Sequence, residues 1–436
     1  MQKVYVETLG CKVNRYETSC VLGQFLEAGY KEAKYMKSAD IIIINTCTVT
    51  NRTDYKSRNL ITNAGLVKKG KPETKIVVTG CYSQRSRDEV KALGFVDLIV
   101  DNNSKNNIYE YIIENLTIDN INFTENEHLT EFSEMEMSSA HDRNRAFLKI
   151  QDGCDYYCSY CIVPFVRGKP RSRSLDSINK QVEKFLSNGY EEIVLSGVNL
   201  GLYRDNGLDL ADLLFELEKY DKLKRIRIGS IEPELFTDKL LYAINKIDKI
   251  CPHFHIPLQT GSDSLLKLHG RKYSVEYFRN LVCKLQQLRP DCALGFDVIV
   301  GLPEETDELF EETYNFLKNI DVAYLHVFMY SKRKGTVANK MANQVHGTIA
   351  KKRSRKLINM ELRKKREYMK RLLENDVTLY AVGETLDVEN NVLMGTSDRY
   401  VRVGYDAGTI NYEPKTLVKL KPINLYEHGI FCEVVK

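Results

Sequence analysis

The sequence lacks the features that would place the protein in a membrane or outside the cell. No apolar run approaches the roughly 20 residues that span a bilayer, and the first residues, MQKVYVETLG, show no signal-peptide pattern. The net charge is only +4 over 436 residues, so the local distribution of basic residues matters more than their total. From these absences we expect a cytoplasmic protein, neither membrane-spanning nor secreted, without a membrane partner.

Cysteine, in contrast, is plentiful. An odd number of cysteines, eleven, without a secretory signal favours metal ligation or buried thiols over a disulfide framework. Cys154, Cys158 and Cys161 form a CxxxCxxC array in LKIQDGCDYYCSYCIVPFVRG. Three thiolates can hold three irons of a 4Fe-4S cube and leave the fourth iron open for a substrate or cofactor. The alternative is a structural zinc loop with His253 or His255 as fourth ligand, although zinc sites usually pair CxxC elements.

Residues 1–100 alternate short apolar runs with longer mixed segments, which predicts an open parallel α/β domain. The strand candidates KVYVETLG, DIIIINT and KIVVTG each end next to a cysteine, namely Cys11, Cys47 and Cys81. Carboxyl ends of parallel strands share one edge of a sheet, so these thiols are expected to converge and suggest a second cluster. Alternatively they pack as small buried hydrophobes. We interpret the remaining cysteines in that way: Cys20, Cys251, Cys283, Cys292 and Cys432.

A polar connector over residues 101–145 precedes a longer alternation over residues 146–350. Its six strand candidates are FLKIQDG, EIVLSGV, IRIGSI, FHIPLQ, LGFDVIVG and YLHVFMY, with helix candidates between them. Six strand–helix units predict a partial (βα)6 barrel with its active site at the carboxyl ends of the strands. The CxxxCxxC array follows the first strand and is therefore expected at that face.

Polar groups near these strand ends suit a nucleoside-containing cofactor. Arg173, with Arg167 and Arg171 in VRGKPRSRS, offers a guanidinium for a cofactor carboxylate or belongs to a solvated basic turn. Glycine and proline at a strand end also fit an ordinary turn. The interpretation as a cofactor site therefore depends on the order in which these polar strand ends follow the cysteine array. The candidate cofactor-binding residues are Tyr160, Arg173, Ser196, Gly197, Asn199, Ser230, Glu232 and Gln259.

The C-terminal part changes character twice. Residues 351–371 contain eleven Lys or Arg against two Glu, which indicates a basic helix over residues 351–376 that contacts phosphates or presents a solvated face. Residues 377–436 contain the strand candidates TLYAV, ETLDVE, VLMGT, YVRVGY and LVKLK. A small β-barrel fits them, and such barrels either bind nucleic acid or serve as structural domains. The expected fold class is therefore α/β with a small C-terminal β-barrel.

From end to end the chain resembles the methylthiotransferases of the radical S-adenosylmethionine (radical SAM) superfamily. LKIQDGCDYYCSYCIVPFVRG matches the superfamily's cluster-binding loop, TLGCKVNRYE, NTCTVT and TGCYSQ match the auxiliary-cluster stretches, and the last domain resembles the barrel called TRAM. Lys12, Val13 and Asn14 resemble the subgroup that modifies N6-threonylcarbamoyladenosine in tRNA. HVFMYSKRKGT also resembles that subgroup's HVFPYS stretch, with Met329 in place of the usual Pro.

This resemblance implies S-adenosylmethionine and two 4Fe-4S clusters as cofactors. Cys154, Cys158 and Cys161 would hold the radical SAM cluster, and the cysteines of the N-terminal domain would hold an auxiliary cluster carrying sulfur. A 5′-deoxyadenosyl radical would activate adenine C2, where C–H is replaced by C–S–CH3. The implied partners are the tRNA anticodon stem-loop, an electron donor such as flavodoxin or ferredoxin, and a sulfur donor. The implied substrate-binding residues are Lys12, Asn14, Arg353, Arg355, Arg363, Lys364, Lys365 and Arg366.

Two other interpretations remain open at this point. The same chemistry acts on isopentenyladenosine or on a ribosomal-protein aspartate in sibling subgroups, which typically have CQMN or CPKN where this chain has CKVN. A non-catalytic RNA-binding protein with a structural metal would also explain the basic helix and the barrel. That interpretation gives no reason for two separate groups of three cysteines.

Overall fold

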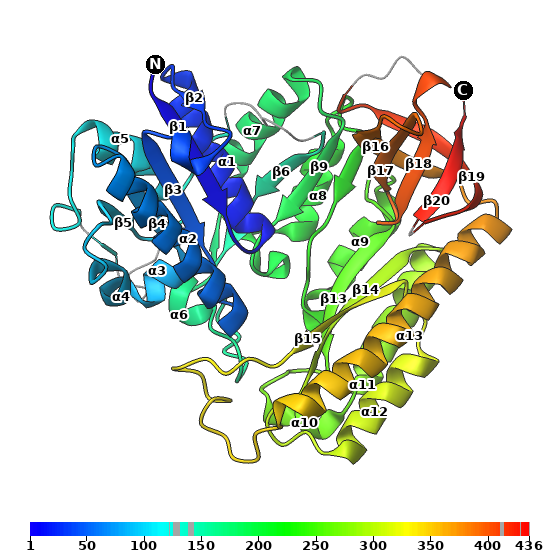
Figure 1. Ribbon diagram of the computed structural model, residues 1–436. Helices are drawn as coiled ribbons and strands as arrows, with labels where there is room; N and C mark the ends of the chain where they lie inside the picture. Colours follow the sequence, from blue (N-terminus) through cyan, green and yellow to red (C-terminus); the bar gives the residue numbers. More distant parts are fainter. Residues whose placement is uncertain (122, 125–130, 138–143, 410–413, 428, 436) are drawn as a thin grey trace. The chain divides into compact units, whose positions relative to one another are not determined.

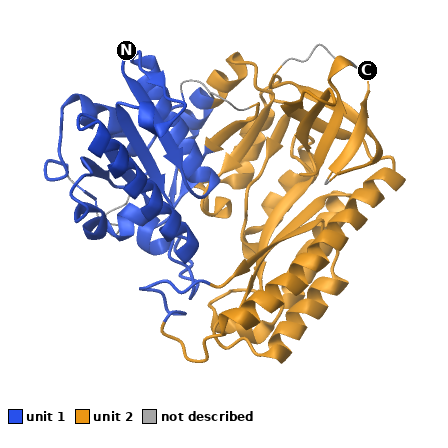
Figure 2. Cartoon of the chain, viewed as in Figure 1, with its two compact units in different colours: residues 1–141, 149–181, 331–339 blue, residues 142–148, 182–330, 340–436 orange. Residues whose placement is uncertain are grey.

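A computed structural model describes residues 1–121, 123–124, 131–137, 144–409, 414–427 and 429–435 (Figure 1). Parts of the expected connector over residues 101–145 therefore lie outside the described residues. The chain divides into two compact units, each built from separate stretches of sequence (Figure 2). Unit 1 comprises residues 1–141, 149–181 and 331–339, and unit 2 comprises residues 142–148, 182–330 and 340–436.

Unit 1 is built on a five-stranded sheet with the order β2-β1-β3-β4-β5, in which every pairing is parallel. The isoleucine run at residues 41–44 forms the start of β3 and is fully buried, as expected for a parallel strand covered on both faces. The strands are β1 (Lys3–Thr8), β2 (Lys31–Glu32), β3 (Ile41–Thr46), β4 (Lys75–Gly80) and β5 (Leu98–Val100). The helices are α1 (Lys12–Glu27), α2 (Asn51–Gly70), α3 (Cys81–Arg85), α4 (Arg87–Lys91) and α5 (Ile108–Ile113), with 3-10 turns η1 (Met36–Ser38) and η2 (Ser104–Asn107).

The CxxxCxxC array also belongs to unit 1. The short antiparallel strands β7 (Gln151–Asp152) and β8 (Arg171–Ser172) pair at its base, and α6 (Pro164–Arg167) lies between them in sequence. The following helix, α7 (Leu175–Ser187), continues the chain into unit 2. The pairing of β7 with β8 thus holds the two ends of residues 151–172 together.

Unit 2 contains the partial barrel. Its strands form the orders β12-β9-β6 and β13-β14-β15, and a parallel bridge between Ile226 and Ile250 links the two groups. This arrangement confirms the expected six strands. They are β6 (Ala146–Lys149), β9 (Glu192–Ser196), β12 (Arg225–Arg227), β13 (His253–Gln259), β14 (Ala293–Val300) and β15 (Tyr324–Met329), with a small pair β10 (Arg204–Asp205) and β11 (Leu208–Asp209). The helices are α8 (Leu210–Glu218), α9 (Asp238–Lys246), α10 (Asp263–Leu268), α11 (Val275–Leu288) and α12 (Asp307–Asn319), with η4 (Leu200–Leu202) and η5 (Pro233–Leu235).

The C-terminal part of unit 2 consists of the long helix α13 (Gly347–Glu374) and a closed barrel with the order β16-β17-β18-β20-β19. Leu357, Met360 and Leu372 form part of the buried face of α13. The stretches TLYAV and ETLDVE, expected as separate strands, form one strand whose register shifts between Gly383 and Thr385. The strands are β16 (Leu379–Asp387), β17 (Val392–Ser397), β18 (Arg402–Asp406), β19 (Leu417–Tyr426) and β20 (Gly429–Val434), with η6 (Ala407–Thr409).

The last strand, β20, was not expected from the sequence. It pairs with β19 and with β18 and closes the barrel. The expected α/β class with a small C-terminal β-barrel is confirmed. Within the described part of the chain, no helix combines the length and the apolar character that crossing a bilayer requires.

Candidate active site

Three cysteines lie at the carboxyl edge of the unit 1 sheet. These strand-end cysteines, Cys11, Cys47 and Cys81, directly follow or closely follow β1, β3 and β4, which are neighbours in the sheet. Cys11 is exposed, whereas Cys47 and Cys81 are buried. The fold therefore gathers three thiols that are far apart in sequence at one edge, as the strand pattern predicts.

The surroundings of the strand-end cysteines fit an iron–sulfur cluster. Burial raises the pKa of Cys47 to about 11 and also raises the pKa of Cys81. Such buried thiols stay neutral until a metal displaces their protons. Cys11 is the N-cap residue of α1, and Thr50, shortly after Cys47, caps α2. The partial positive charge at these helix starts favours an anionic cluster.

The CxxxCxxC loop, residues 153–168, holds the second group of cysteines. The N–H of Cys154 donates to the carbonyl oxygen of Gly168 at 3.0 Å, which closes the loop at its base. The N–H of Cys161 donates to the carbonyl oxygen of Cys158 at 2.9 Å, which forms a tight turn between these two cysteines. Cys158 is buried, and Cys154, Cys161 and the neighbouring Tyr160 are half-buried. Three thiols on one short, closed loop match the donor set that leaves one iron of a 4Fe-4S cube open.

A glycine in the left-handed backbone region directly precedes the first cysteine of each group. Gly10 has φ +102°, and a Cβ atom there would lie 2.8 Å from Sγ of Cys47. Gly153 has φ +73°, and its Cβ atom would lie 2.0 Å from the carbonyl oxygen of Lys169. Any other residue would meet both a backbone strain and a clash at these positions. The two glycines therefore allow the backbone to pass close to Cys47 in one group and to Lys169 at the base of the CxxxCxxC loop in the other.

A third stretch of unit 1, residues 331–339, contacts residues close to both cysteine groups. Arg333 is buried and its Nη1 donates to the carbonyl oxygen of Thr48 at 3.0 Å and to Oδ2 of Asp54 at 2.7 Å. Farther along the same stretch, the N–H of Ala338 donates to the carbonyl oxygen of Ser159 at 2.8 Å. Thr48 follows Cys47 and Ser159 lies within the CxxxCxxC loop. Residues 331–339 therefore link the loop after Cys47 to the CxxxCxxC loop through hydrogen bonds.

Four of the expected cofactor-binding residues lie at the ends of β9 and β13 in unit 2. Ser196 ends β9 and its hydroxyl donates to the carbonyl oxygen of Leu148 at 3.2 Å. Gly197 and the buried Asn199 follow it. Gln259 ends β13 with φ +66°, a left-handed conformation that is uncommon for a residue other than glycine. Backbone strain of this kind concentrates at functional sites.

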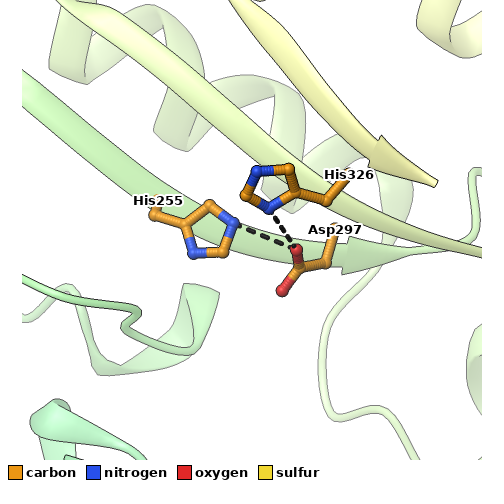
Figure 3. A group of neighbouring side chains, drawn as sticks. All are labelled: His255, Asp297 and His326. Atoms are coloured by element: carbon orange, nitrogen blue, oxygen red, sulfur yellow. Dashed lines mark hydrogen bonds and ion pairs between the residues drawn. The ribbon is translucent and has the colours of Figure 1, made fainter. Parts of the chain in front are cut away.

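Unit 2 also contains a hydrogen-bonded cluster on three adjacent strands (Figure 3). Oδ1 of Asp297 on β14 accepts from Nε2 of His255 on β13 at 3.0 Å and from Nδ1 of His326 on β15 at 3.2 Å. Burial alone would raise the pKa of Asp297, but the hydrogen bonds from the two imidazoles hold it well below its usual range. Ser230, after β12, contacts Nδ1 of His255. The four side chains form a fixed polar group on the sheet.

Four predicted site residues have partners within the protein. Asn14, Arg173 and Arg353 are buried, and Glu232 is ion-paired. These partners are Leu9, Thr46 and Arg167 for Asn14, Tyr16 and Ser177 for Arg173, Glu305 and Asp307 for Arg353, and Arg271 for Glu232.

The remaining basic candidates are more open. Lys12 is exposed at the start of α1 in unit 1. On α13 in unit 2, Arg355, Arg363 and Arg366 are exposed, and Lys364 and Lys365 are half-buried. Nζ of Lys364 donates to the carbonyl oxygen of Ile320 at 2.7 Å. Ile320 directly follows α12, so this lysine is bound to the partial barrel domain. The exposed arginines are therefore the members of this set that α13 offers to a partner.

Sequence reasoning did not single out Arg333, Asp297 or His326. Asp297 had a usable signal, because a carboxylate in the apolar strand LGFDVIVG needs a partner. His326 stands between apolar residues in YLHVFMY. Because successive side chains of a strand point to opposite faces, His326 lies on the face opposite to that of its direct neighbours. Arg333 is one of several basic residues in SKRKGT, and nothing local distinguishes it from its neighbours.

Comparisons with known proteins agree with this arrangement. Residues 148–317 match the Radical SAM superfamily, and residues 3–101 match a family described as Uncharacterized protein family UPF0004. The fold resembles that of TsrM, a radical S-adenosylmethionine methyltransferase from Kitasatospora setae, with a TM-score of 0.58 and 13% identity over 78% of this chain and 77% of that chain. At this identity the likeness concerns the fold alone. The fold and the CxxxCxxC loop thus define a radical SAM enzyme.

Two relatives identify the family more closely. The chain is 39% identical to Threonylcarbamoyladenosine tRNA methylthiotransferase MtaB of Bacillus subtilis over 100% of this chain and 98% of that protein. It is 35% identical to tRNA-2-methylthio-N(6)-dimethylallyladenosine synthase of Thermodesulfovibrio yellowstonii over 78% of this chain and 79% of that protein. The chain belongs to the radical SAM methylthiotransferase family. Its cofactors are accordingly S-adenosylmethionine and two 4Fe-4S clusters.

Proposed function

We propose that the protein inserts a methylthio group at C2 of N6-threonylcarbamoyladenosine next to the anticodon of tRNA. The observation that carries this proposal is the match to the Bacillus subtilis enzyme along the whole length of the chain. A second candidate, the same reaction on isopentenyladenosine, is favoured by the Thermodesulfovibrio yellowstonii relative, which matches over a smaller share of the chain. The two candidates differ only in the group on N6 of the adenine.

The proposed ligands are Cys154, Cys158 and Cys161 for one cluster and the strand-end cysteines for the other. Bound there with S-adenosylmethionine, the cofactors supply a 5′-deoxyadenosyl radical and the sulfur to be transferred. In the overall change, the adenine loses one C–H bond, its hydrogen leaves on 5′-deoxyadenosine, and a second S-adenosylmethionine supplies the methyl group. The chain itself holds both sets of thiols in one compact unit, so that their loops keep a fixed relation.

Contacts with RNA are proposed for unit 2. Arg355, Arg363 and Arg366 are exposed on α13 and suit phosphate groups. A hollow of about 600 Å³ lies between α13 and the end of β19. Recognition of a folded RNA loop rests on phosphates, shape and bases that leave the stack. The hollow is lined by Leu362, Lys365, Arg366, Met369, Leu425 and Glu427.

Polar groups at the barrel strands are proposed to bind the nucleoside parts of cofactor and substrate. Ser196, Asn199 and Gln259 lie at strand ends, and the His255–Asp297–His326 cluster offers further donors. Further partners proposed for the reaction are an electron donor such as flavodoxin or ferredoxin and a sulfur donor. The cytoplasm is the proposed place of action, because the proposed substrate is tRNA.

The experiment that tests this function is mass spectrometry of tRNA nucleosides from cells lacking the protein. Loss of 2-methylthio-N6-threonylcarbamoyladenosine with accumulation of the unthiolated nucleoside supports the proposal. Loss of the methylthio form of isopentenyladenosine instead would replace it with the second candidate. Restoring the gene in the same cells is the control, and it should return the missing nucleoside.

A further inference from the structure

A buried network of charges joins the two cysteine groups of unit 1, and Arg167 lies at its centre. Arg167 is the last residue of α6 and is 2% exposed. Its Nη1 donates to Oδ1 and Oδ2 of Asp152 at 2.8 and 2.9 Å and to Oε1 of Glu17 at 3.1 Å. Its Nη2 donates to Oδ1 of Asn14 at 2.6 Å. One guanidinium therefore binds both α1, the helix that follows β1, and β7 at the base of the CxxxCxxC loop.

Both ends of this link reach backbone groups next to cysteines. Nδ2 of Asn14 donates to the carbonyl oxygens of Leu9 at 2.8 Å and Thr46 at 3.0 Å; Leu9 directly follows β1, and Thr46 is the last residue of β3. At the other end, Oδ1 of Asp152 accepts the N–H of Gly153 at 2.8 Å. A continuous series of hydrogen bonds thus runs from the backbone near Cys11 and Cys47 through Asn14 and Arg167 to Gly153 at the start of the CxxxCxxC loop.

Apolar packing reinforces the same contact. The side chain of Cys81 packs with Ile162 and Val166 in a buried cluster. Nδ2 of Asn102, from the segment after β5, donates to the carbonyl oxygen of Val166 at 2.7 Å. One strand-end cysteine therefore lies against the helix that carries Arg167.

The network contains more positive than negative charge. Two buried carboxylates, Glu17 and Asp152, contact the buried cations Lys105, Lys149, Arg167 and Arg171. A buried surplus of positive charge is costly unless an anion lies nearby. Iron-bound thiolates would supply that anion.

The charge of Arg167 acts on the strand-end cysteines, and the charge of Lys105 acts on Cys81 as well. Burial alone would lower the pKa of Arg167, but Asp152 and Glu17 outweigh burial, and the thiols of Cys81 and Cys11 act in the same direction. For Arg171, burial lowers the pKa, and the charges that act on it include those of Asp152, Arg167 and Glu17. The two arginines share Asp152, but Arg167 also binds Asn14, which contacts the ends of β1 and β3, whereas Arg171 donates to the carbonyl oxygens of Arg167 and Lys169.

We propose that Arg167 is a positioning residue that fixes the CxxxCxxC loop to the strand-end cysteines and raises the reduction potential of the cluster they hold. The proposal rests on the ligand role given to the strand-end cysteines under the proposed function. Reduction adds negative charge to a cluster, and a buried cation beside it stabilises the reduced form. Removal of the cation therefore shifts the potential to more negative values.

The test is an anaerobic redox titration, followed by electron paramagnetic resonance, on the full-length chain with Cys154, Cys158 and Cys161 replaced by Ala. Only the cluster of the strand-end cysteines then contributes a signal. R167Q is expected to shift the midpoint potential to a more negative value, and R167K, which keeps the charge, to return it most of the way. R171Q is the matched control, because it also removes a buried arginine next to Asp152, and it should leave the potential unchanged.

The outcomes separate this inference from the proposed function. An unchanged potential in R167Q, or an equal shift in R171Q, overturns the inference. If R167Q retains no iron, the R167K variant decides the question. Because R167K keeps the positive charge, a midpoint potential far from that of the unsubstituted chain would also overturn the inference. The titration requires no tRNA, so a wrong nucleoside substrate would leave its result intact. Conversely, a correct nucleoside product with an unchanged potential would overturn the inference about Arg167 alone.

Discussion

Arg333 donates to Asp54 at 2.7 Å, although the two residues lie 279 positions apart in the sequence. Asp54 belongs to α2, the helix that follows Cys47, and is 4% exposed. It also accepts from Arg85 at 3.0 Å and from the hydroxyl of Thr48 at 2.6 Å. The backbone around one strand-end cysteine therefore depends on a residue that follows the last barrel strand.

The first prediction concerns this ion pair. R333A should lower the free energy of unfolding of unit 1 by about 3 kcal/mol, because it removes one of two cations from a buried carboxylate. Iron content should fall as well, since the loop after Cys47 loses its hydrogen bond to Arg333. Urea unfolding and iron analysis of anaerobically purified protein measure both effects. K332A, which changes an exposed neighbour, should match the unsubstituted protein, and equal stability of R333A would contradict the prediction.

The second prediction separates the two groups of cysteines. C154A is expected to abolish cleavage of S-adenosylmethionine, whereas C47A should still form 5′-deoxyadenosine without any methylthiolated product. Each variant should retain about four of the roughly eight irons that two clusters require. C283A, which removes an exposed cysteine on α11, serves as the control and should keep both activities. Complete loss of cleavage in C47A would refute the division of roles.

The third prediction concerns the basic face of α13. Affinity for the anticodon stem-loop should fall steeply with salt, because bound phosphates release counterions. R363E and R366E should each reduce the slope of log affinity against log salt by about 1 for every phosphate that the variant no longer binds. Filter binding or fluorescence anisotropy over a salt series gives that slope. K318E on α12 makes the same charge change at another exposed position, and an equal reduction there would argue against a specific role for α13.

The fourth prediction concerns acid stability. Burial alone would raise the pKa of Glu192, but Arg225 and Arg227 lower it to about 2. The unfolded chain therefore binds a proton at this carboxyl more readily than the folded chain does, and stability falls as the pH drops. The contribution, about 3 kcal/mol, is present above pH 4.5 or so and is lost between there and about pH 2.

Urea unfolding of unit 2 between pH 6 and 3 would check this contribution. E192Q should be less stable than the unsubstituted protein at pH 6, and the gap should narrow as the pH falls. E216Q is a matched control, because Glu216 forms its ion pair with Lys219 on the surface. A gap that stayed constant with pH would show that Glu192 does not carry the acid dependence.

Local sequence pattern predicted the fold well wherever one segment decides its own structure. The isoleucines of residues 41–44 can only be a buried strand, and the six strands of the partial barrel repeat a regular alternation. The C-terminal barrel was less complete, because TLYAV and ETLDVE are separated by Gly383, which marks a bulge within one strand rather than a turn. Strand β20 was missed, although its run GIFCEV follows β19 closely in the sequence and pairs with it as well as with β18.

The candidate site was predictable in its thiols but not in the contacts that hold them. Spacing identifies Cys154, Cys158 and Cys161, and strand ends identify the N-terminal group. The role of Arg167 depends on partners up to 153 positions away. The resemblance implies a substrate contact for Asn14, and only the structure shows that its amide also binds the ends of two strands. Only tertiary structure shows which polar residue beside a site faces inward.

The three separate stretches of unit 1 also have a consequence for biosynthesis. A chain leaves the ribosome from its N-terminus, so the residues of the parallel sheet emerge long before residues 331–339 are made. Until then Asp54 lacks Arg333, and Ser159 lacks the N–H of Ala338. We therefore expect the N-terminal sheet to mature late, after most of the barrel has been translated. Assembly of the metal centres should accordingly be a post-translational step, and a truncated nascent chain should carry little bound iron.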